Sequence, residues 1–317
     1  MSSGSRFLIA AGALLIAAVG CRGSDARASS ACRPVYAVQY GTGYRTEGVA
    51  VLDPDGKTAR IGKDWIAREP SFSPNGMSLA VTWFDSISEG RRTAIAIFDV
   101  DSKRRAIVRG TGGGEYPAWS PDGSTVAYAY NDDRADAQEI RLFDAATGHH
   151  NRAITHQPAG RTSVMSPAWS HDGNQLAFVI DDPFSGPATV WVVDRSGAGL
   201  HQVASFTGPD KVNRVSWRPD GEALLLSNGA HATLLDLGTS AVRAITPQVS
   251  NVVSVGDTDR VVYDRSHGEV SPLGGYRYFP TAGTLHGTRI RRRRDLKGIP
   301  PRRGFPHGVV MAATCTA

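Results

Sequence analysis

The sequence predicts an all-β protein, a β-propeller of four-stranded blades, from three observations. A short strand followed by a tight turn recurs four times, and its aromatic residue returns at steps of 47, 50 and 48 residues. A second hairpin, whose first strand ends in an apolar residue and Asp, recurs between these copies. The 317 residues also include 35 Gly and 18 Pro, which suits many tight turns. Two hairpins in roughly 45–50 residues make four strands, the size of one propeller blade.

Each copy of the first repeat is a strand, a turn and a returning strand. The aromatic residues that precede the turns are Phe72, Trp119, Trp169 and Trp217. The glycines that close the turns are Gly76, Gly123, Gly173 and Gly221. Pro presets the first turn dihedral, Asp or Asn bonds to the nearby backbone, and Gly adopts the positive φ that closes the hairpin. We expect the aromatic side chains to fill the gap between neighbouring sheets and to serve structure only.

The second repeat places an aspartate at each of its turns. The five aspartates are Asp53, Asp99, Asp144, Asp194 and Asp236. An Asp at such a position accepts hydrogen bonds from the backbone of its own turn. The two repeats together predict four strands in each unit.

The four aromatic-containing segments, each with Pro or His, Asp or Asn, and Gly after the aromatic residue, resemble the repeats of the TolB-like β-propeller family. The resemblance covers residues 35–265 and implies six blades. Along the chain we count a first blade that lacks its first strand, four complete blades, and a sixth that opens near residue 249 and is degenerate. We therefore expect a propeller at 35–280 whose closure by strand sharing is poor.

The N-terminal residues predict export. Arg6 is the only charge before an apolar run that is too short to span a bilayer and fits a signal peptide. An Ala-Val-Gly-Cys segment ending at Cys21 resembles a lipobox, so that residues 1–21 would form the signal peptide and lipobox and 22–34 a tether. Cys21 would then carry a lipid anchor. Ala26-Arg27-Ala28 offers an alternative cleavage site, which would leave a freely secreted protein.

Residues 281–317 differ from the body in composition, and we expect them to form a basic, disordered tail. The net charge is +5, but eight Lys and Arg stand between Arg289 and Arg303 against Asp295 alone. The body is therefore not basic, and we expect no nucleic-acid partner. A polyanion-binding arm and an altered reading frame are the alternatives for this segment.

Known catalytic motifs are missing from the sequence. It holds no G-x-S-x-G nucleophile elbow, no H-E-x-x-H, no Walker loop and no paired CxxC. We therefore expect no catalytic residues, no cofactor and no metal site.

Aspartates recur where the second strand of a blade ends. Asp85, Asp132 and Asp182 each stand 13 residues after the aromatic residue, and Asp133 and Asp181 adjoin them. Second-strand ends emerge on one face of a propeller, near the channel, so these residues predict an acidic rim that receives a cation, an amine or a basic peptide. The alternative is that exposed strand ends are simply polar.

Two cysteines remain if Cys21 is lipidated. Cys32 lies just before the first strand and Cys315 lies three residues from the C-terminal end. Export places both in an oxidising compartment, and ring closure would bring them together, so that a disulfide between them would clamp the ring. The alternative is a free Cys315 in the tail.

These features predict a non-catalytic, extracytoplasmic scaffold at the cell envelope. The resemblance implies that it docks an envelope protein or peptide on a face or in the channel. We expect a monomer that reaches the membrane through its lipid anchor. The alternative is an enzyme, a polysaccharide lyase or hydrolase, with its site in the channel, where Tyr116, Ser166 and Arg214 stand at the starts of first strands.

Overall fold

The computed structural model describes fourteen stretches of the chain. They are residues 33–42, 45–52, 58–61, 66–84, 93–102, 104–132, 137–156, 162–182, 186–228, 230–246, 249–255, 259–270, 276–295 and 309–316. The chain divides into two compact units, Met1–Ala31 and Cys32–Ala317, and all described residues lie in the second. Within them, no helix is long and apolar enough to cross a membrane.

The described strands form six four-stranded antiparallel sheets. The first contains β24 (Val309–Thr316), β1 (Arg33–Thr42), β2 (Arg45–Leu52) and β3 (Thr58–Ile61). The second contains β4 (Ile66–Phe72), β5 (Ser78–Phe84), β6 (Thr93–Asp99) and β7 (Arg105–Ile107). The third contains β8 (Gly114–Trp119), β9 (Thr125–Asp132), β10 (Ala137–Asp144) and β11 (Arg152–Ala153).

The remaining three sheets follow the same order along the chain. The fourth contains β12 (Ser163–Trp169), β13 (Gln175–Asp181), β14 (Ala188–Asp194) and β15 (His201–Phe206). The fifth contains β16 (Arg214–Trp217), β17 (Ala223–Ser227), β18 (Ala232–Asp236) and β19 (Val242–Ala244). The sixth contains β20 (Ser250–Ser254), β21 (Arg260–Val270), β22 (Tyr276–His286) and β23 (Arg289–Asp295). A 3₁₀ helix, Gly208–Asp210, joins the fourth and fifth sheets.

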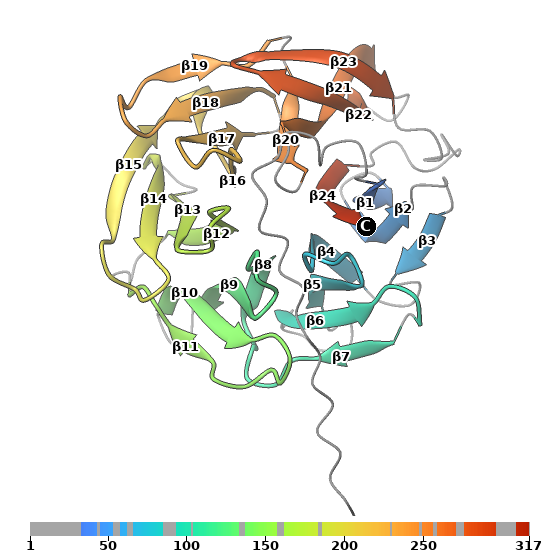
Figure 1. Cartoon of the computed structure of the whole chain (residues 1–317), viewed down its shortest axis with the longest axis vertical. Helices are drawn as coiled ribbons and strands as arrows, with labels where there is room; N and C mark the ends of the chain where they lie inside the picture. The colour runs from blue at the N-terminus through green and yellow to red at the C-terminus, as the bar shows by residue number, and fades with distance from the viewer. Residues whose placement is uncertain are drawn as a thin grey trace, which may run out of the picture. The chain divides into compact units, whose positions relative to one another are not determined.

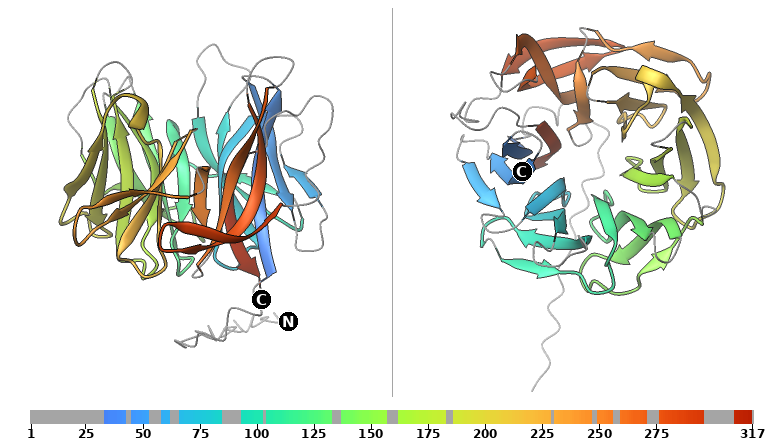
Figure 2. Two further views of the ribbon diagram at one scale, coloured as in Figure 1. Left: turned by 90° about the horizontal axis from the view of Figure 1, so that it is seen from above. Right: turned by 180° about the vertical axis from the view of Figure 1, so that it is seen from behind.

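The six sheets of this unit follow one another around a ring. The innermost strands contact each other in the closed order β24, β4, β8, β12, β16, β20 and back to β24. Figure 1 shows these six strands around the centre and the outer strands, such as β7 and β15, at the edge. Seen from the side in Figure 2, the strands run between two faces that carry the turns and connections. The prediction of an all-β propeller with four-stranded blades is therefore confirmed.

The C-terminal strand closes the ring, which corrects the expectation of poor closure. β24 pairs antiparallel with β1, with Arg33 opposite Thr316 and Gln39 opposite Val309. The last strand thus supplies the inner strand that the first sheet lacks. The repeat pattern could not predict this pairing, because the strand that completes the first sheet lies at the opposite end of the sequence.

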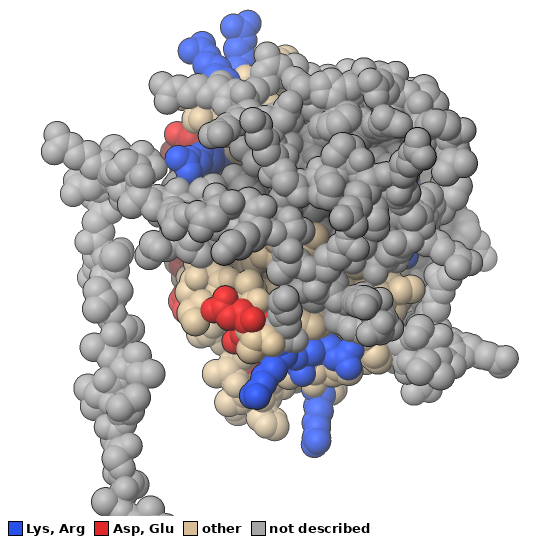
Figure 3. Space-filling view, turned by 90° about the vertical axis from the view of Figure 1, so that its right-hand side faces the viewer, with Lys and Arg blue, Asp and Glu red and all other residues tan. Residues whose placement is uncertain are grey.

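The expected boundary at residue 280 is also wrong. Residues expected in the basic tail 281–317 belong instead to β22, β23 and β24, and the sixth sheet has all four strands. In β23 Ile290 is buried, whereas Arg289 and Arg291 are exposed. The outermost strand of a sheet has one open edge and one solvated face, so charged residues are tolerated there and reduce edge-to-edge association. On the face shown in Figure 3, the described acidic and basic side chains lie in small groups of each sign.

Large aromatic residues fill the spaces between sheets. Phe72, Trp169 and Trp217 are buried, and Ala80, Ala127 and Ala177 are fully buried in second strands. The indole N–H of Trp169 donates to the carbonyl of Ala118 in the preceding sheet at 3.1 Å, and Trp217 donates to Ala168 at 3.0 Å. Each indole thus satisfies its polar group across the sheet junction.

Trp119 departs from this pattern. It is partly exposed, and its buried indole N–H makes no hydrogen bond within the described part of the chain. The expectation that every repeat aromatic is buried between blades therefore does not hold at this junction.

The hairpin turns have the local chemistry that their residues predict. The turn glycines all have positive φ, namely Gly76 at 73°, Gly123 at 71°, Gly173 at 72° and Gly221 at 73°. In the second hairpins, the carboxylates of Asp99, Asp144 and Asp236 accept backbone N–H bonds at 2.6, 2.9 and 2.8 Å. These hydrogen bonds hold the pKa of each of the three carboxyls below its ordinary value.

Candidate functional site

Three inner strands share an unusual backbone position three residues before the aromatic residue. Glu69, Tyr116 and Ser166 have φ of 51°, 52° and 52°, although none is a glycine, and each precedes a proline. The pairing register shifts at the same place in all three strands. A left-handed conformation costs a non-glycine residue about 1 kcal/mol or more. The same β-bulge thus recurs in three successive sheets and is a regular feature of their inner strands. It points these three side chains in a different direction from that in a regular strand.

The fifth sheet departs from this bulge. Its corresponding residue is Arg214, which pairs regularly with Ser227. The four equivalent positions thus carry an acid, a phenol, a hydroxyl and a guanidinium.

A hydrogen-bonded network joins the second and third sheets at this level. The hydroxyl of Thr82, which is fully buried, donates to Oε2 of Glu69 at 2.6 Å. The backbone N–H of Tyr116 donates to the Thr82 hydroxyl oxygen at 3.0 Å and to Glu69 Oε2 at 3.4 Å. These contacts fix the Glu69 carboxyl against the neighbouring inner strand.

Burial raises the pKa of the Glu69 carboxyl above its ordinary value. The Thr82 hydroxyl and the positive charge of Arg214 oppose this effect, as do the Tyr116 amide and Arg68. Burial, together with the charge of Glu69, likewise raises the pKa of the Tyr116 hydroxyl. Arg214 acts on both groups although its sheet is not adjacent to that of Glu69. Glu69, Tyr116 and Arg214 all lie on inner strands of the ring, the strands that surround the channel, and the charge of Arg214 reaches the other two groups.

We refer to Glu69, Tyr116, Ser166 and Arg214 as the channel set. Tyr116, Ser166 and Arg214 were predicted from their positions in the repeat, whereas Glu69 was not. The signal was available, since Glu69 stands three residues before Phe72 just as Tyr116 does before Trp119. What the spacing could not show is that opposite inner strands bring an acid and a guanidinium into the same space.

The structure describes the expected acidic rim only in part. Asp85 and Asp133 lie outside the described residues, and of Asp132 only the backbone, at the end of β9, is described. Asp181 ends β13, and its Oδ1 accepts a hydrogen bond from Lys211 Nζ at 2.9 Å. Lys211 also donates to the backbone carbonyl of Asp182. A lysine thus neutralises part of the negative charge at the fourth sheet.

The structure describes only one of the three cysteines, and only its backbone. Cys21 and Cys32 lie outside the described residues, and the backbone of Cys315 in β24 lies opposite Pro34 in β1. Pairing of these strands brings the backbone of Cys315 close to that of Pro34, two residues after Cys32 in the chain. Within the described residues, no group of three or more His, Cys, Asp or Glu side chains could hold a metal ion.

Six antiparallel four-stranded sheets in a ring, with polar residues on four of the inner strands, define a β-propeller. Residues 25–271 match the family model of the TolB beta propeller domain. The chain therefore belongs to the TolB β-propeller domain family.

Solved structures share this fold. The chain is similar to TolB from Acinetobacter baumannii, with a TM-score of 0.62 and 18% identity over 89% of this chain and 66% of that chain. It thus spans just under two thirds of that protein's length. It is also similar to a chain in a Nidogen/Laminin complex, with a TM-score of 0.61 and 12% identity over 89% of this chain and 98% of that chain.

A third similar structure is oligogalacturonate lyase in complex with manganese. The TM-score is 0.53 and the identity 13%, over 76% of this chain and 72% of that chain. At such low identities these likenesses establish the fold alone.

Proposed function

We propose that this protein is a non-catalytic scaffold outside the cytoplasm, whose propeller receives a segment of an envelope protein or peptide at the channel. The observation that carries this proposal is the channel set. Glu69 and Arg214 place a carboxyl and a guanidinium on opposite inner strands, and Tyr116 and Ser166 add hydroxyl groups on the two inner strands between them. The Ser166 hydroxyl oxygen also accepts from the backbone N–H of Val215 at 3.3 Å. A peptide carries groups of both signs and amides, which such a mixed lining can bind.

The N-terminal segment supports a location at the membrane. Residues 1–21 have the composition of a signal peptide with a lipobox. We therefore propose that Cys21 is lipidated and that residues 22–34 tether the propeller to the membrane. The family assignment supports a binding role, and one similar propeller belongs to a Nidogen/Laminin complex. We propose that the protein acts as a monomer.

We further propose that the acidic rim of Asp85, Asp132, Asp133, Asp181 and Asp182 steers a basic partner segment toward the channel. Steering of this kind depends on the ionic strength. Lys211 pairs with Asp181, which reduces the share of that residue in the effect.

The alternative is an enzyme, a polysaccharide lyase or hydrolase with its site in the channel. The likeness to oligogalacturonate lyase and the buried Glu69 carboxyl favour testing it. Incubation with oligogalacturonate, followed through the ultraviolet absorbance of unsaturated products, separates the two. Turnover that is lost in Glu69→Gln would overturn the scaffold proposal.

Photo-crosslinking tests the scaffold proposal directly. Benzoylphenylalanine replaces Tyr116 in the channel set, and the control carries it at Val242, which is exposed on the outer strand β19. We expect an adduct with an envelope protein from position 116 and none from 242. The purified partner should then bind Glu69→Gln and Arg214→Gln about tenfold more weakly than the unaltered protein. Equal adducts from both positions, or unchanged affinity in both variants, would contradict the proposal.

A further inference from the structure

Four successive sheets share one side-chain position directly after the aspartate of the second hairpin. The residues there are Val100, Ala145, Arg195 and Leu237. Each donates its backbone N–H to the carbonyl of the residue that follows the turn glycine, at 2.8 or 2.9 Å; the acceptors are Met77, Ser124, Asn174 and Glu222. Because the backbone contact is the same in all four sheets, the four side chains start from equivalent places.

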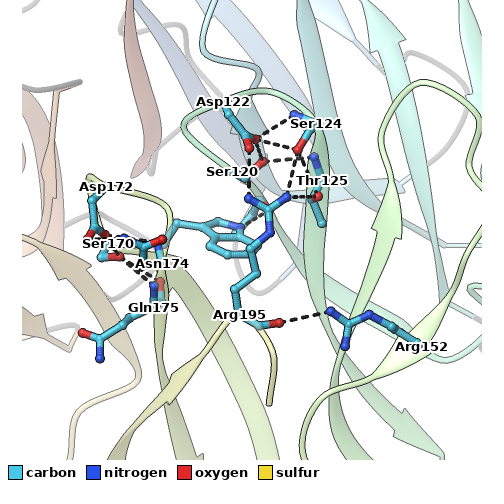
Figure 4. A network of polar contacts seen from close by, with 12 residues as sticks. Ser120, Asp122, Ser124, Thr125, Arg152, Ser170, Asp172, Asn174, Gln175 and Arg195 are labelled. Atoms are coloured by element: carbon cyan, nitrogen blue, oxygen red, sulfur yellow. Dashed lines mark hydrogen bonds and ion pairs between the residues drawn. The ribbon is translucent and has the colours of Figure 1, made fainter. Parts of the chain in front are cut away.

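In the fourth sheet Arg195 fills the space at this position (Figure 4). Its guanidinium lies over the Trp169 ring at 5.3 Å, and Nη1 donates to Asp122 Oδ2 at 2.9 Å. Nη2 donates to the hydroxyl groups of Ser124 and Thr125 at 2.8 and 2.6 Å. The side chain thus occupies the gap between the tryptophan of its own sheet and the turn of the preceding sheet.

The second and fifth sheets fill the gap with apolar side chains. Val100 packs against the cluster that contains Phe72, and Leu237 packs against the cluster that contains Trp217.

The third sheet has only a methyl group there, because the residue is Ala145. A surface pocket of about 210 Å³ lies at the corresponding junction. Its lining residues are Ser73, Pro74, Asn75, Ser78, Trp119, Asp122 and Gly123. One repeat later, their counterparts in the sequence are Ser120, Pro121, Asp122, Thr125, Trp169, Asp172 and Gly173, which include the residues that hold Arg195. The pocket is therefore the space that a side chain like Arg195 would occupy.

The pocket differs from the Arg195 site at two residues. Met77 stands where Ser124 offers Arg195 a hydroxyl group, and Asn75 stands where Asp122 offers a carboxylate. Asn75 Oδ1 accepts from the Ser73 hydroxyl at 2.7 Å and from the Met77 N–H at 3.0 Å. Asp122 Oδ1 accepts the equivalent bonds from Ser120 and Ser124 at 2.5 and 2.9 Å, which leaves Oδ2 for Arg195. The Nδ2 amide of Asn75 consequently stands where the carboxylate oxygen would bind a guanidinium, so a donor replaces an acceptor.

Asp122 lines the pocket from the third sheet. Its Oδ1 accepts from Ser120 and Ser124 and its Oδ2 from Arg195, so Oδ2 retains one lone pair for a further donor. Although burial opposes it, hydrogen bonds from Ser120, Ser124 and Arg195 hold the pKa of the Asp122 carboxyl well below its usual range. Asp122 is thus ionised at neutral pH and disfavours an anionic ligand. The Ser78 hydroxyl is the counterpart of the Thr125 hydroxyl that accepts from Arg195.

We propose that this pocket, between the second and third sheets, binds the primary carboxamide of an asparagine or glutamine side chain presented by a partner protein. The carboxamide carbonyl accepts from Asn75 Nδ2, its NH₂ group donates to Ser78 and Asp122, and its plane lies on the Trp119 ring. A guanidinium would direct its N–H groups against the Asn75 amide, and a carboxylate would meet the charge of Asp122. The site lies at the hairpin turns and is independent of the channel set.

A titration with three blocked amino acids tests the proposal. The ¹⁵N-labelled protein is titrated with the N-acetyl methylamides of glutamine, arginine and glutamate, and the indole N–H signal of Trp119, assigned with Trp119→Phe, is followed. We expect a saturable shift with the glutamine compound and none with the other two. A shift of equal midpoint with the arginine compound, or no saturable shift with glutamine, would overturn the proposal.

Two variants make the test specific. Ala145→Leu fills the pocket with the apolar side chain that the fifth sheet has at this position and should abolish the response to the glutamine compound. Asn75→Asp restores the acceptor found at Asp122, and because Asp already occupies this turn position in three other sheets, the fold is retained. It should reverse the preference from glutamine to arginine. A glutamine response that survives Ala145→Leu, or an unchanged preference in Asn75→Asp, would show that the ligand binds elsewhere.

Discussion

Arg195→Ala tests how strongly a single side chain joins two sheets. The side chain makes an ion pair with Asp122, two bonds to hydroxyl groups and a contact with the Trp169 ring. The Arg195 and Asp122 side chains are 34% and 53% exposed, so solvent screens the ion pair and it contributes only about 0.5 kcal/mol. The hydroxyl bonds contribute about 0.5 kcal/mol each, and the ring contact a similar amount. We expect the variant to lose about 2 kcal/mol of unfolding free energy.

Urea denaturation at pH 7 measures this loss, and Arg218→Ala is the matched control. Arg218 forms an ion pair of 2.7 Å with Asp220, but the two residues lie in one turn and join no sheets. The control should therefore cost less than about 1 kcal/mol. Equal losses in the two variants would refute the reasoning that Arg195 joins neighbouring sheets.

The pH dependence of the Asp122 contribution has a definite sign. Since the pKa of Asp122 is lowered in the folded state, its stabilisation is present above the unfolded pKa of about 4 and is lost as the pH falls through the folded value. The advantage in unfolding free energy of the unaltered protein over Asp122→Asn should therefore shrink as the pH falls below about 4. An advantage that stays constant from about pH 5 to about pH 2 would show that the hydrogen bonds and the ion pair do not hold this carboxyl ionised.

Four further predictions concern other parts of the molecule. Trp169→Ala should cost about 3–5 kcal/mol of unfolding free energy, because it leaves a cavity and an unpaired carbonyl at a sheet junction; an unchanged melting temperature with lost binding would assign the residue to function instead. Burial raises the pKa of Glu69, so its contribution to stability is present below about pH 4 and is lost as the pH rises through the folded value; the urea midpoint of Glu69→Gln should lack this decline, and parallel pH profiles would contradict the assignment. Mass spectrometry of the native protein should find a diacylglyceryl group on Cys21 that is absent from Cys21→Ser, and an unmodified mature N-terminus further along the chain would instead indicate free secretion. Peptide mapping without reductant should find Cys32 joined to Cys315, which would stabilise the closed ring by about 4–5 kcal/mol, whereas a free thiol at Cys315 in exported protein would exclude the clamp.

Sequence alone determined the local structure of this protein. The turn residues, the alternation of large and small apolar residues and the recurring aromatics predicted the hairpins, the four-stranded sheets and the propeller. Each hairpin depends on contacts between residues close together in the chain, such as the bond from Gly123 N–H to the Ser120 carbonyl, so one copy of the repeat is enough to predict it. The recurrence of the copies along the chain then predicts the propeller.

Only the tertiary structure decided how the sheets meet. It placed β24 beside β1, made the arginine-rich segment an outer strand, and brought Arg214 within electrostatic reach of Glu69. It also showed that Ala145 opens a space that Arg195 fills in the next sheet. These relations join residues tens to hundreds of positions apart, and they arise because closing the ring, rather than any local preference, determines which side chains face each other.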